Sequence, residues 1–203
     1  MMGELEALRR RYGGYAPGLL GARRSYAVLV PLLRTADGLR LLFEVRAAAL
    51  RQGGEVCFPG GRMEPGETPE ECALRETEEE LAIPADEVEL FGPTDFICNQ
   101  RGFLLRPVVG LVSAAGMERL RPSPAEVAEA FTVPLAFFRE SAPVAARYEL
   151  VPQVPEDFPY AAAGIAQDYP WSRGMVEVLS WQYEGHVIWG MTARIVKDIL
   201  KGL

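Results

Sequence analysis

The residues best suited to chemistry are three glutamates that one predicted helix gathers on a single face. At about 100° per residue, the segment 71–81 brings Glu76, Glu79 and Glu80 together. Such carboxylates repel one another by roughly a few tenths of a kcal/mol per pair, so the face has reason to hold a cation. Oxygen ligands without a histidine or a thiolate pair favour Mg²⁺ or Mn²⁺ over zinc. The alternative is a solvated acidic helix with ordinary salt bridges.

A glycine-rich loop precedes this helix, and loop and helix together form a longer pattern. The pattern is Gly61, five residues, Glu67, seven residues, Arg75-Glu76-Thr77, one residue, Glu79-Glu80, one residue, Ala82-Ile83. This segment, 61–83, resembles the catalytic box of the Nudix family, which has an apolar residue where Thr77 stands and a glycine where Ala82 stands. Neither departure removes a carboxylate. A left-handed helix end at Ala82 would be costlier than at glycine.

The resemblance implies a fold and an activity. The fold is α+β, an α/β/α sandwich with a mixed β-sheet in which the box forms a loop, a helix and a second loop, and we expect one domain over 1–203. The activity is hydrolysis of a nucleoside diphosphate linked to a further moiety. The implied metal ligands are the backbone carbonyl of Gly61 and the carboxylates of Glu76, Glu79 and Glu80. Bound Mg²⁺ or Mn²⁺ would neutralise the pyrophosphate and lower the pKa of an attacking water.

The catalytic residues that the resemblance implies are Glu79, Glu80 and Arg75. Arg75 borders the acidic face and can hold one carboxylate in position through a charge-assisted hydrogen bond. Glu67 is assigned to holding Arg75 or the loop. In many relatives a further acid from outside the box acts as base or ligand, and Glu126 or Glu129 is the candidate here. We place both in a predicted short helix over 123–130, and an amphipathic surface helix explains them equally well.

A second resemblance lies upstream of the box, in the segment 50–61 (LRQGGEVCFPGG). It is similar to the extra signature of the coenzyme A pyrophosphatases, except that Gln52 stands in place of a histidine and the preceding Leu-Arg pair lies one position late. The segments 106–112, 126–138 and 186–196 also look like that subfamily. The resemblance makes four residues of this loop candidates for substrate binding: Gln52, Gly54, Phe58 and Gly60. Arg24, just before the first strand, could meet a phosphate or be solvated.

This resemblance implies hydrolysis of coenzyme A or acyl-coenzyme A to 3′,5′-ADP and 4′-phosphopantetheine or its acyl form. The alternatives are a pyrophosphatase for ADP-ribose or a similar compound and a sensor that binds a nucleotide without cutting it, which the intact glutamates argue against. We expect 152–189 to form a cap or specificity segment. Its aromatic residues and Phe58 could line a groove for a flexible arm. These aromatic residues are Phe158, Tyr160, Tyr169 and Trp171. His186, the one histidine, is expected to anchor the last strand or helix.

The predicted elements alternate between strands and separated helices, which indicates α+β or an α/β sandwich. Thr68, Pro69 and Glu71 predict a helix start with a capping box. An Asp-Gly turn at 36–38 predicts a hairpin between the first two strands. The expected strands are 26–33, 39–45, 56–58, 88–97, 103–112, 144–151 and 176–183. The expected helices, besides 123–130, are 4–12, 68–81 and 192–200.

The composition excludes several classes of protein. The 203 residues are 49% hydrophobic and 24% charged, which is typical of a globular chain rather than a disordered one. Residues 55–95 hold two arginines against thirteen acids, a net of −11, so binding to nucleic acid through phosphates is not expected. The longest apolar run near the N-terminus, 27–33, is too short to cross a membrane. We expect a cytoplasmic protein with reduced cysteines. We also expect a small-molecule nucleotide substrate, and the sequence is compatible with a homodimer.

Overall fold

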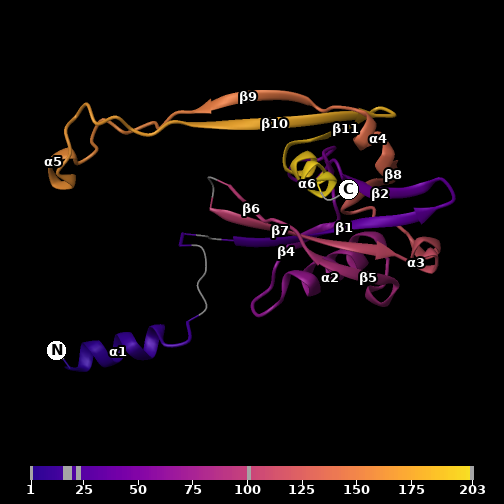
Figure 1. Cartoon of the computed structure of the whole chain (residues 1–203), viewed down its shortest axis with the longest axis horizontal. Helices are drawn as coiled ribbons and strands as arrows, with labels where there is room; N and C mark the ends of the chain where they lie inside the picture. The colour runs from indigo at the N-terminus through magenta and orange to yellow at the C-terminus, as the bar shows by residue number, and fades with distance from the viewer. Residues whose placement is uncertain (1, 16–19, 22–23, 100–101, 202–203) are drawn as a thin grey trace.

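A mixed β-sheet forms the centre of the molecule (Figure 1). The computed structural model describes residues 2–15, 20–21, 24–99 and 102–201. The strand order is β3-β2-β1-β7-β5, with β4 paired to β1, β6 to β7 and β8 to β2. The pairing of β1 with β7 is parallel and that of β1 with β2 is antiparallel. The bounds of these strands are β1 Arg24–Thr35, β2 Gly38–Arg46, β3 Val56–Cys57, β4 Gly60–Arg62, β5 Val88–Pro93, β6 Ile97–Cys98, β7 Phe103–Val112 and β8 Val127–Pro134.

Helix α2, Pro69–Leu81, covers one face of this sheet (Figure 1). It begins as the sequence predicts, because the Thr68 side chain accepts from the backbone N–H of Glu71 while the Glu71 carboxylate accepts from that of Thr68. Its apolar stripe packs on the central strands, and Cys72, Ala73 and Leu81 are fully buried. The helix ends at Ala82 in the left-handed region, with φ 56°. The acidic face of α2 is therefore held in a fixed rotation about the helix axis.

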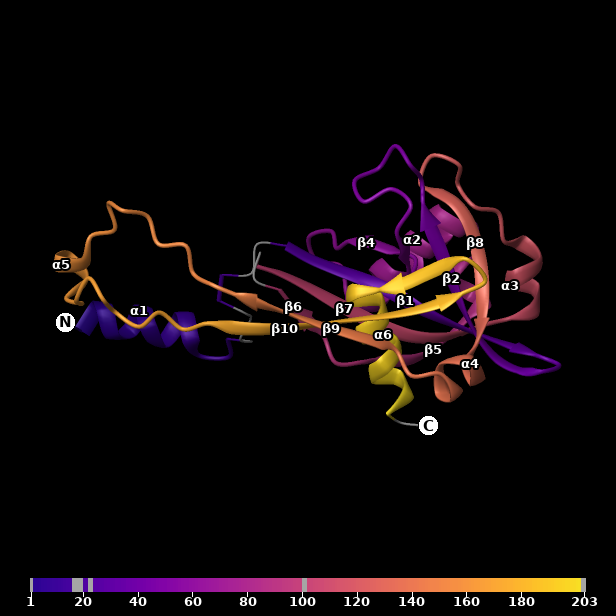
Figure 2. The ribbon, with the colours of Figure 1, turned by 90° about the horizontal axis from the view of Figure 1, so that it is seen from above.

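The opposite face carries the larger hydrophobic core and a second sheet. The second sheet has the order β11-β10-β9, and helix α6, Gly190–Leu200, packs between it and the central sheet (Figures 1 and 2). This core includes Phe43, Phe58, Trp181, Ile188 and Val196. The strands are β9 Val144–Leu150, β10 Gly174–Tyr183 and β11 His186–Trp189. Helices on both sides of a mixed sheet confirm the predicted α+β architecture.

The prediction of a helix over 123–130 is wrong. Residues 124–126 form a turn, and β8 then pairs antiparallel with β2, placing Ala130 opposite Glu44 and Glu129 opposite Val45. The acids and small residues of this segment have a helical spacing. The β-branched and aromatic residues that follow, through Val133, favour a strand. This strand pairs with β2 along one of its edges.

Short helices lie at the ends of the strands and in the connecting segments. They are the 3₁₀ helix Ala85–Glu87, α3 Ala114–Arg119, α4 Leu135–Glu140 and α5 Tyr160–Ala163.

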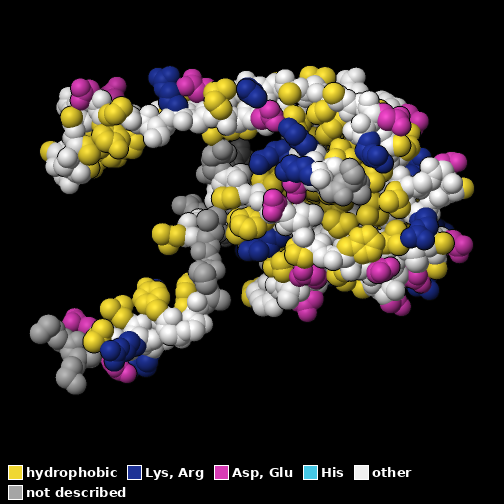
Figure 3. Space-filling model, viewed as in Figure 1, with side chains coloured by type: hydrophobic (Ala, Val, Ile, Leu, Met, Phe, Trp, Pro, Cys, Tyr) yellow, Lys and Arg dark blue, Asp and Glu magenta, His cyan; other side chains and the backbone are white. Residues whose placement is uncertain are grey.

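Two parts extend away from this body. The N-terminal helix α1, Met2–Tyr12, and the arm that joins β9 to β10 and contains α5 project on the same side (Figures 1 and 2). Hydrophobic side chains gather on α1 and at the tip of the arm (Figure 3). The strands at the base of this arm, over 144–150 and 174–183, agree with the predicted ones. No helix among the described residues is long and apolar enough to span a bilayer.

Candidate functional site

Arg75 lies at the centre of the acidic face of α2 and binds three carboxylates. Its guanidinium is 2.8 Å from Glu67 Oε1, 2.9 Å from Glu76 Oε1 and 3.2 Å from Glu79 Oε2. The hydrogen bond from Arg75 lowers the pKa of Glu67 to about 2. Glu67 is thus ionised at neutral pH and holds Arg75 in place, as the sequence predicts. Arg75 in turn orients Glu76 and Glu79 from the side of the loop.

Gly61 and Glu76 are in direct contact where β4 passes α2. A Cβ at residue 61 would overlap the carboxyl group of Glu76, so only glycine leaves room for it. The Cys72 thiol, which is buried, donates to the backbone carbonyl of Gly61 at 3.7 Å. Burial raises the pKa of Glu76, although Arg75 opposes this shift. The structure therefore places the backbone of Gly61 against the Glu76 carboxyl group at the start of the box.

Glu80 is the most deeply buried of the three glutamates, with a relative exposure of 5%. Its Oε2 accepts a hydrogen bond of 2.8 Å from the backbone N–H of Gly60. Gly60 has φ 152°, and a Cβ there would overlap the backbone of Ala27 and Val28 on β1. Burial, followed by the negative charge of Glu44, raises the pKa of Glu80. One hydrogen bond does not offset the cost of burying the ionised Glu80 carboxylate. A cation bound at this site would stabilise the ionised form.

Glu44 is a site residue that the sequence analysis missed. It lies on β2, is fully buried and accepts a hydrogen bond of 3.3 Å from the Cys57 thiol to Oε1. Its Oε2 is also buried and has no hydrogen-bond partner among the described residues. Burial raises the pKa of Glu44, and Arg46 partly opposes this. The one feature of the sequence that could have indicated Glu44 as a site residue is its position as the single acid in the otherwise apolar segment 41–45.

The donor set fits a divalent cation. The carbonyl of Gly61 and the carboxylates of Glu76, Glu79 and Glu80 are hard oxygen ligands, which Mg²⁺ and Mn²⁺ prefer. Burial disfavours the ionised form of Glu76 and Glu80, and a cation would reverse that cost. Within the described ranges, no three acidic, histidine or cysteine side chains converge as a ready metal cage. The guanidinium of Arg75 instead lies against the acidic face and neutralises part of its charge.

The two acids proposed from outside the box lie in different surroundings. The turn that contains Glu126 is tied to α2, because the N–H of Ser123 donates to the carbonyl of Glu80 at 2.8 Å. Burial is the main reason that the pKa of Glu44 and of Glu76 is raised, and the nearby charge of Glu126 adds to both shifts. Glu126 therefore lies close enough to the acidic cluster for its charge to act on it, at an exposed position.

Glu129 belongs to a different cluster, with His186. Its Oε2 lies 3.1 Å from His186 Nε2, and the His186 ring stacks on Phe131 with centroids 3.7 Å apart. His186 anchors the start of β11, as expected.

The candidate substrate residues of the upstream loop divide into exposed and buried ones. Gln52 is exposed, has φ 62° and donates from Nε2 to Glu55 at 3.1 Å. Gly54 has φ 82° and open space around its Cα. Phe58 lies in the core at 2% exposure, stacked on Phe43, so its side chain is not available to a ligand. Arg24 is exposed at the first position of β1.

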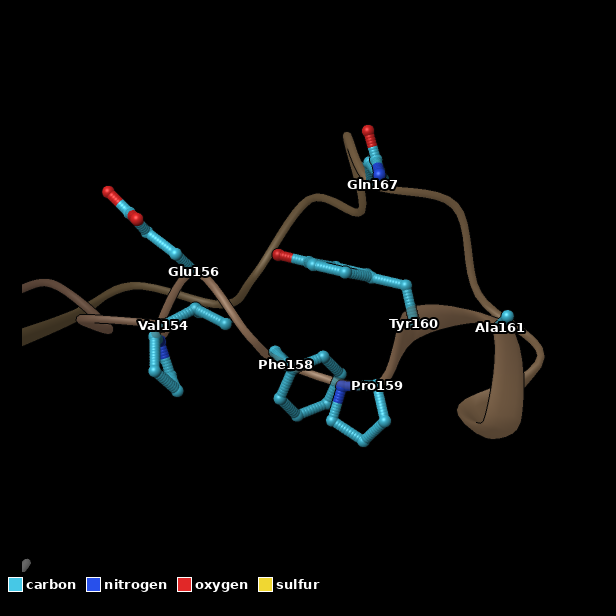
Figure 4. A pocket seen from close by; sticks show the side chains of 8 residues that line it. Val154, Glu156, Phe158, Pro159, Tyr160, Ala161 and Gln167 are labelled. Atoms are coloured by element: carbon cyan, nitrogen blue, oxygen red, sulfur yellow. The ribbon is translucent and has the colours of Figure 1, made fainter.

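The expected aromatic groove does not form as predicted. Phe158, Tyr160, Tyr169 and Trp171 pack on one another at the tip of the arm, with ring centroids 4.9 to 5.3 Å apart. Figure 4 shows Phe158 and Tyr160 beside a cavity of about 580 Å³ there. Phe58 lies in the core of the body, because its neighbours along the chain are strands of the central sheet. The arm aromatics and Phe58 therefore do not share one groove.

Comparison with known proteins gives consistent matches. A model of the NUDIX domain matches residues 23–153. A mouse protein, peroxisomal coenzyme A diphosphatase, is 39% identical over 115 residues, covering 56% of this chain and 48% of that protein. A Photorhabdus laumondii protein, described as an uncharacterized Nudix hydrolase, is 31% identical over 177 residues, covering 87% of this chain and 83% of that protein. The chain thus spans about half the length of the mouse relative and most of the bacterial one.

A solved structure shares the fold. The crystal structure of a Nudix hydrolase from M. Smegmatis has a TM-score of 0.50 and 24% identity, and the match covers 58% of this chain and 74% of that one.

Proposed function

The chain belongs to the Nudix family, and on that premise we propose that it is a pyrophosphohydrolase that acts on coenzyme A or acyl-coenzyme A. Water adds across the diphosphate, the bridging P–O bond breaks, and the products are 3′,5′-ADP and 4′-phosphopantetheine or its acyl form. The acidic face of α2, whose Glu76 and Glu80 contact Gly61 and Gly60, is the observation that carries the hydrolase activity.

Mg²⁺ or Mn²⁺ would be held by Gly61, Glu76, Glu79 and Glu80. When bound, the metal would neutralise the charge of the diphosphate and lower the pKa of the attacking water. The remaining parts of the site belong to the chain. The Gly60 N–H holds one oxygen of Glu80, and the Cys72 thiol fixes the Gly61 carbonyl.

Two further residues of the chain have roles in this proposal. Arg75 orients Glu76 and Glu79 toward one another. Glu126, which lies close to this cluster, is the proposed base for the attacking water.

The choice of coenzyme A rests on the loop that leads into the box. Residues 54–61 match the coenzyme A pyrophosphatase signature, and the loop ends at the two glycines that contact Glu76 and Glu80. The mouse relative, a coenzyme A diphosphatase by name, supports the same substrate. The departure at Gln52 is the feature that favours the alternative substrate, ADP-ribose.

A substrate panel with product identification tests the proposal. We expect a higher kcat/KM for coenzyme A than for dephospho-coenzyme A or ADP-ribose, with cleavage inside the diphosphate. Activity should vanish in excess chelator and return with Mg²⁺ or Mn²⁺. A tenfold preference for ADP-ribose, about 1.4 kcal/mol of transition-state discrimination, would exclude the coenzyme A assignment and leave the family unchanged. Nucleotide binding without turnover of any substrate would favour the sensor.

A further inference from the structure

A cavity of about 370 Å³ lies between the loop before the box and the hairpin of β10 and β11. Its volume lies in the range of small-molecule sites. The Thr192 hydroxyl donates to the carbonyl of Val56 at 3.2 Å, which ties the start of α6 to the loop. The contact of His186 with Glu129 ties the hairpin to β8. The walls of this cavity, which we name the hairpin cavity, are therefore fixed relative to one another.

The lining of the hairpin cavity selects against phosphate. Its apolar wall includes Val187 and Trp189, each 43% exposed, and its acidic groups are Glu55 and Glu129. No lysine or arginine is among the described residues that line it. The two carboxylates repel an anion and accept hydrogen bonds from N–H donors, and His186, the one histidine of the lining, is already paired with Glu129 at 3.1 Å. The chemistry suits a neutral, partly apolar chain with amide groups.

The position of the cavity relates it to the site on α2. Val56 lines the cavity, and Gly61 lies five residues further along the same loop, so their Cα atoms are at most about 18 Å apart. A substrate whose diphosphate lies at the box can thus place a long arm along the loop and into the cavity. A compact substituent such as a second ribose does not reach as far.

Resting on the proposed function, we infer that the hairpin cavity binds the pantetheine arm of coenzyme A. The arm is uncharged, combines apolar segments with two amide N–H donors, and is long. The 3′-phosphoadenosine end of the same substrate could stack on Trp189, but its phosphate would then lie beside Glu55 and Glu129, which is unfavourable. The cavity would thus contribute to substrate choice from outside the box.

Binding of the two halves of the substrate, measured separately by calorimetry, tests this inference. The probes are pantetheine and 3′,5′-ADP. Val187→Trp fills the cavity from an exposed position, and Val144→Trp makes the same change on the same sheet at a residue 72% exposed and outside the cavity. Thermal unfolding shows whether each variant is folded. We expect Val187→Trp to weaken pantetheine binding at least tenfold and to raise the KM for coenzyme A, with kcat near that of Val144→Trp.

Three outcomes would overturn the inference. These are equal binding of pantetheine to all three proteins, no binding of pantetheine to the wild type at millimolar concentration, and selective loss of 3′,5′-ADP binding in Val187→Trp. The proposed function fails by a different result, which is absence of coenzyme A turnover by the wild type. Binding of pantetheine is measured without turnover, so the two failures are distinguishable.

Discussion

Gly61 and Glu76 contact one another so closely that no side chain fits between them. The contact joins the backbone of β4 to the acidic face of α2. The glycine at this position is required by the close approach of the Glu76 side chain, since the positive φ that often requires glycine is found at Gly60 instead.

We predict that Gly61→Ala displaces the Glu76 carboxylate and lowers kcat/KM by about 100-fold, the usual result of a misplacement of about 1 Å in a site. The matched control is Gly174→Ala, because Gly174 also lies in a strand and a Cβ there would make only ordinary contacts of 3.6 Å. Circular dichroism and initial rates for both variants check this. Wild-type rates in Gly61→Ala would show that the contact does not position Glu76.

Glu80→Gln should abolish turnover while the fold persists. The change removes an anionic ligand and keeps the volume of the side chain, and the amide oxygen can still accept from the Gly60 N–H. Glu78→Gln on the same helix is the control, because Glu78 is exposed and lies off the acidic face. Activity of Glu80→Gln within threefold of the wild type at saturating Mg²⁺ would remove Glu80 from the proposed metal ligands.

Activity should favour alkaline pH. Burial raises the pKa of Glu76 and Glu80, so each binds a proton more tightly than an exposed glutamate does. Protons then compete with the metal for these oxygens as the pH falls, and rising pH frees them. We expect the pH profile of kcat/KM to shift toward lower pH when Mg²⁺ is increased. A profile that does not move with metal concentration would contradict this competition.

The stability of the metal-free protein should depend on pH in the opposite direction. Because the pKa of Glu80 is raised above its ordinary 4.5, the folded state binds the proton more tightly than the unfolded chain does. Protonation of Glu80 thus stabilises the folded state. This contribution to the free energy of unfolding is fully present below pH 4.5 and is lost as pH rises through the raised pKa of Glu80. In chelator, Glu80→Gln should thus gain stability over the wild type by more than about 1 kcal/mol between pH 5 and pH 8. A constant difference in urea unfolding across this range would disprove it.

The sequence predicts the local features of the site and misses those that depend on contacts across the sheet. The capping box at Thr68 follows from short-range spacing, the role of Glu67 in holding Arg75 or the loop follows from the resemblance to the box, and the structure contains both the capping box and the Glu67–Arg75 pair. Glu44 is far from α2 in sequence, and only the folding of the central sheet brings its buried carboxyl group near Glu80. Likewise Phe58 fits a binding loop by motif, yet the sheet places its ring on Phe43.

The segment that contains Glu126 and Glu129 shows why spacing alone misleads. Acids three residues apart fit a helix, and the pairing of β8 with β2 is invisible in a local window. Because of strand β8 and the bulge beside Val45, Glu126 lies near the acidic cluster, whereas Glu129 pairs with His186. The structure thus separates two residues that the sequence treated as equivalent.

The end of α2 gives a last prediction, about stability. Ala82 has φ 56°, a left-handed conformation that costs an L-residue roughly 1 kcal/mol more than glycine, and its side chain is exposed. Ala82→Gly relieves this cost without losing buried surface, while the greater freedom of glycine in the unfolded chain offsets part of the gain. We expect a net stabilisation of about 0.5 kcal/mol. Ala145→Gly, at an exposed position of β9 without positive φ, should instead destabilise. Urea unfolding of both variants decides the matter, and a loss of stability in Ala82→Gly would mean that the left-handed end is not strained.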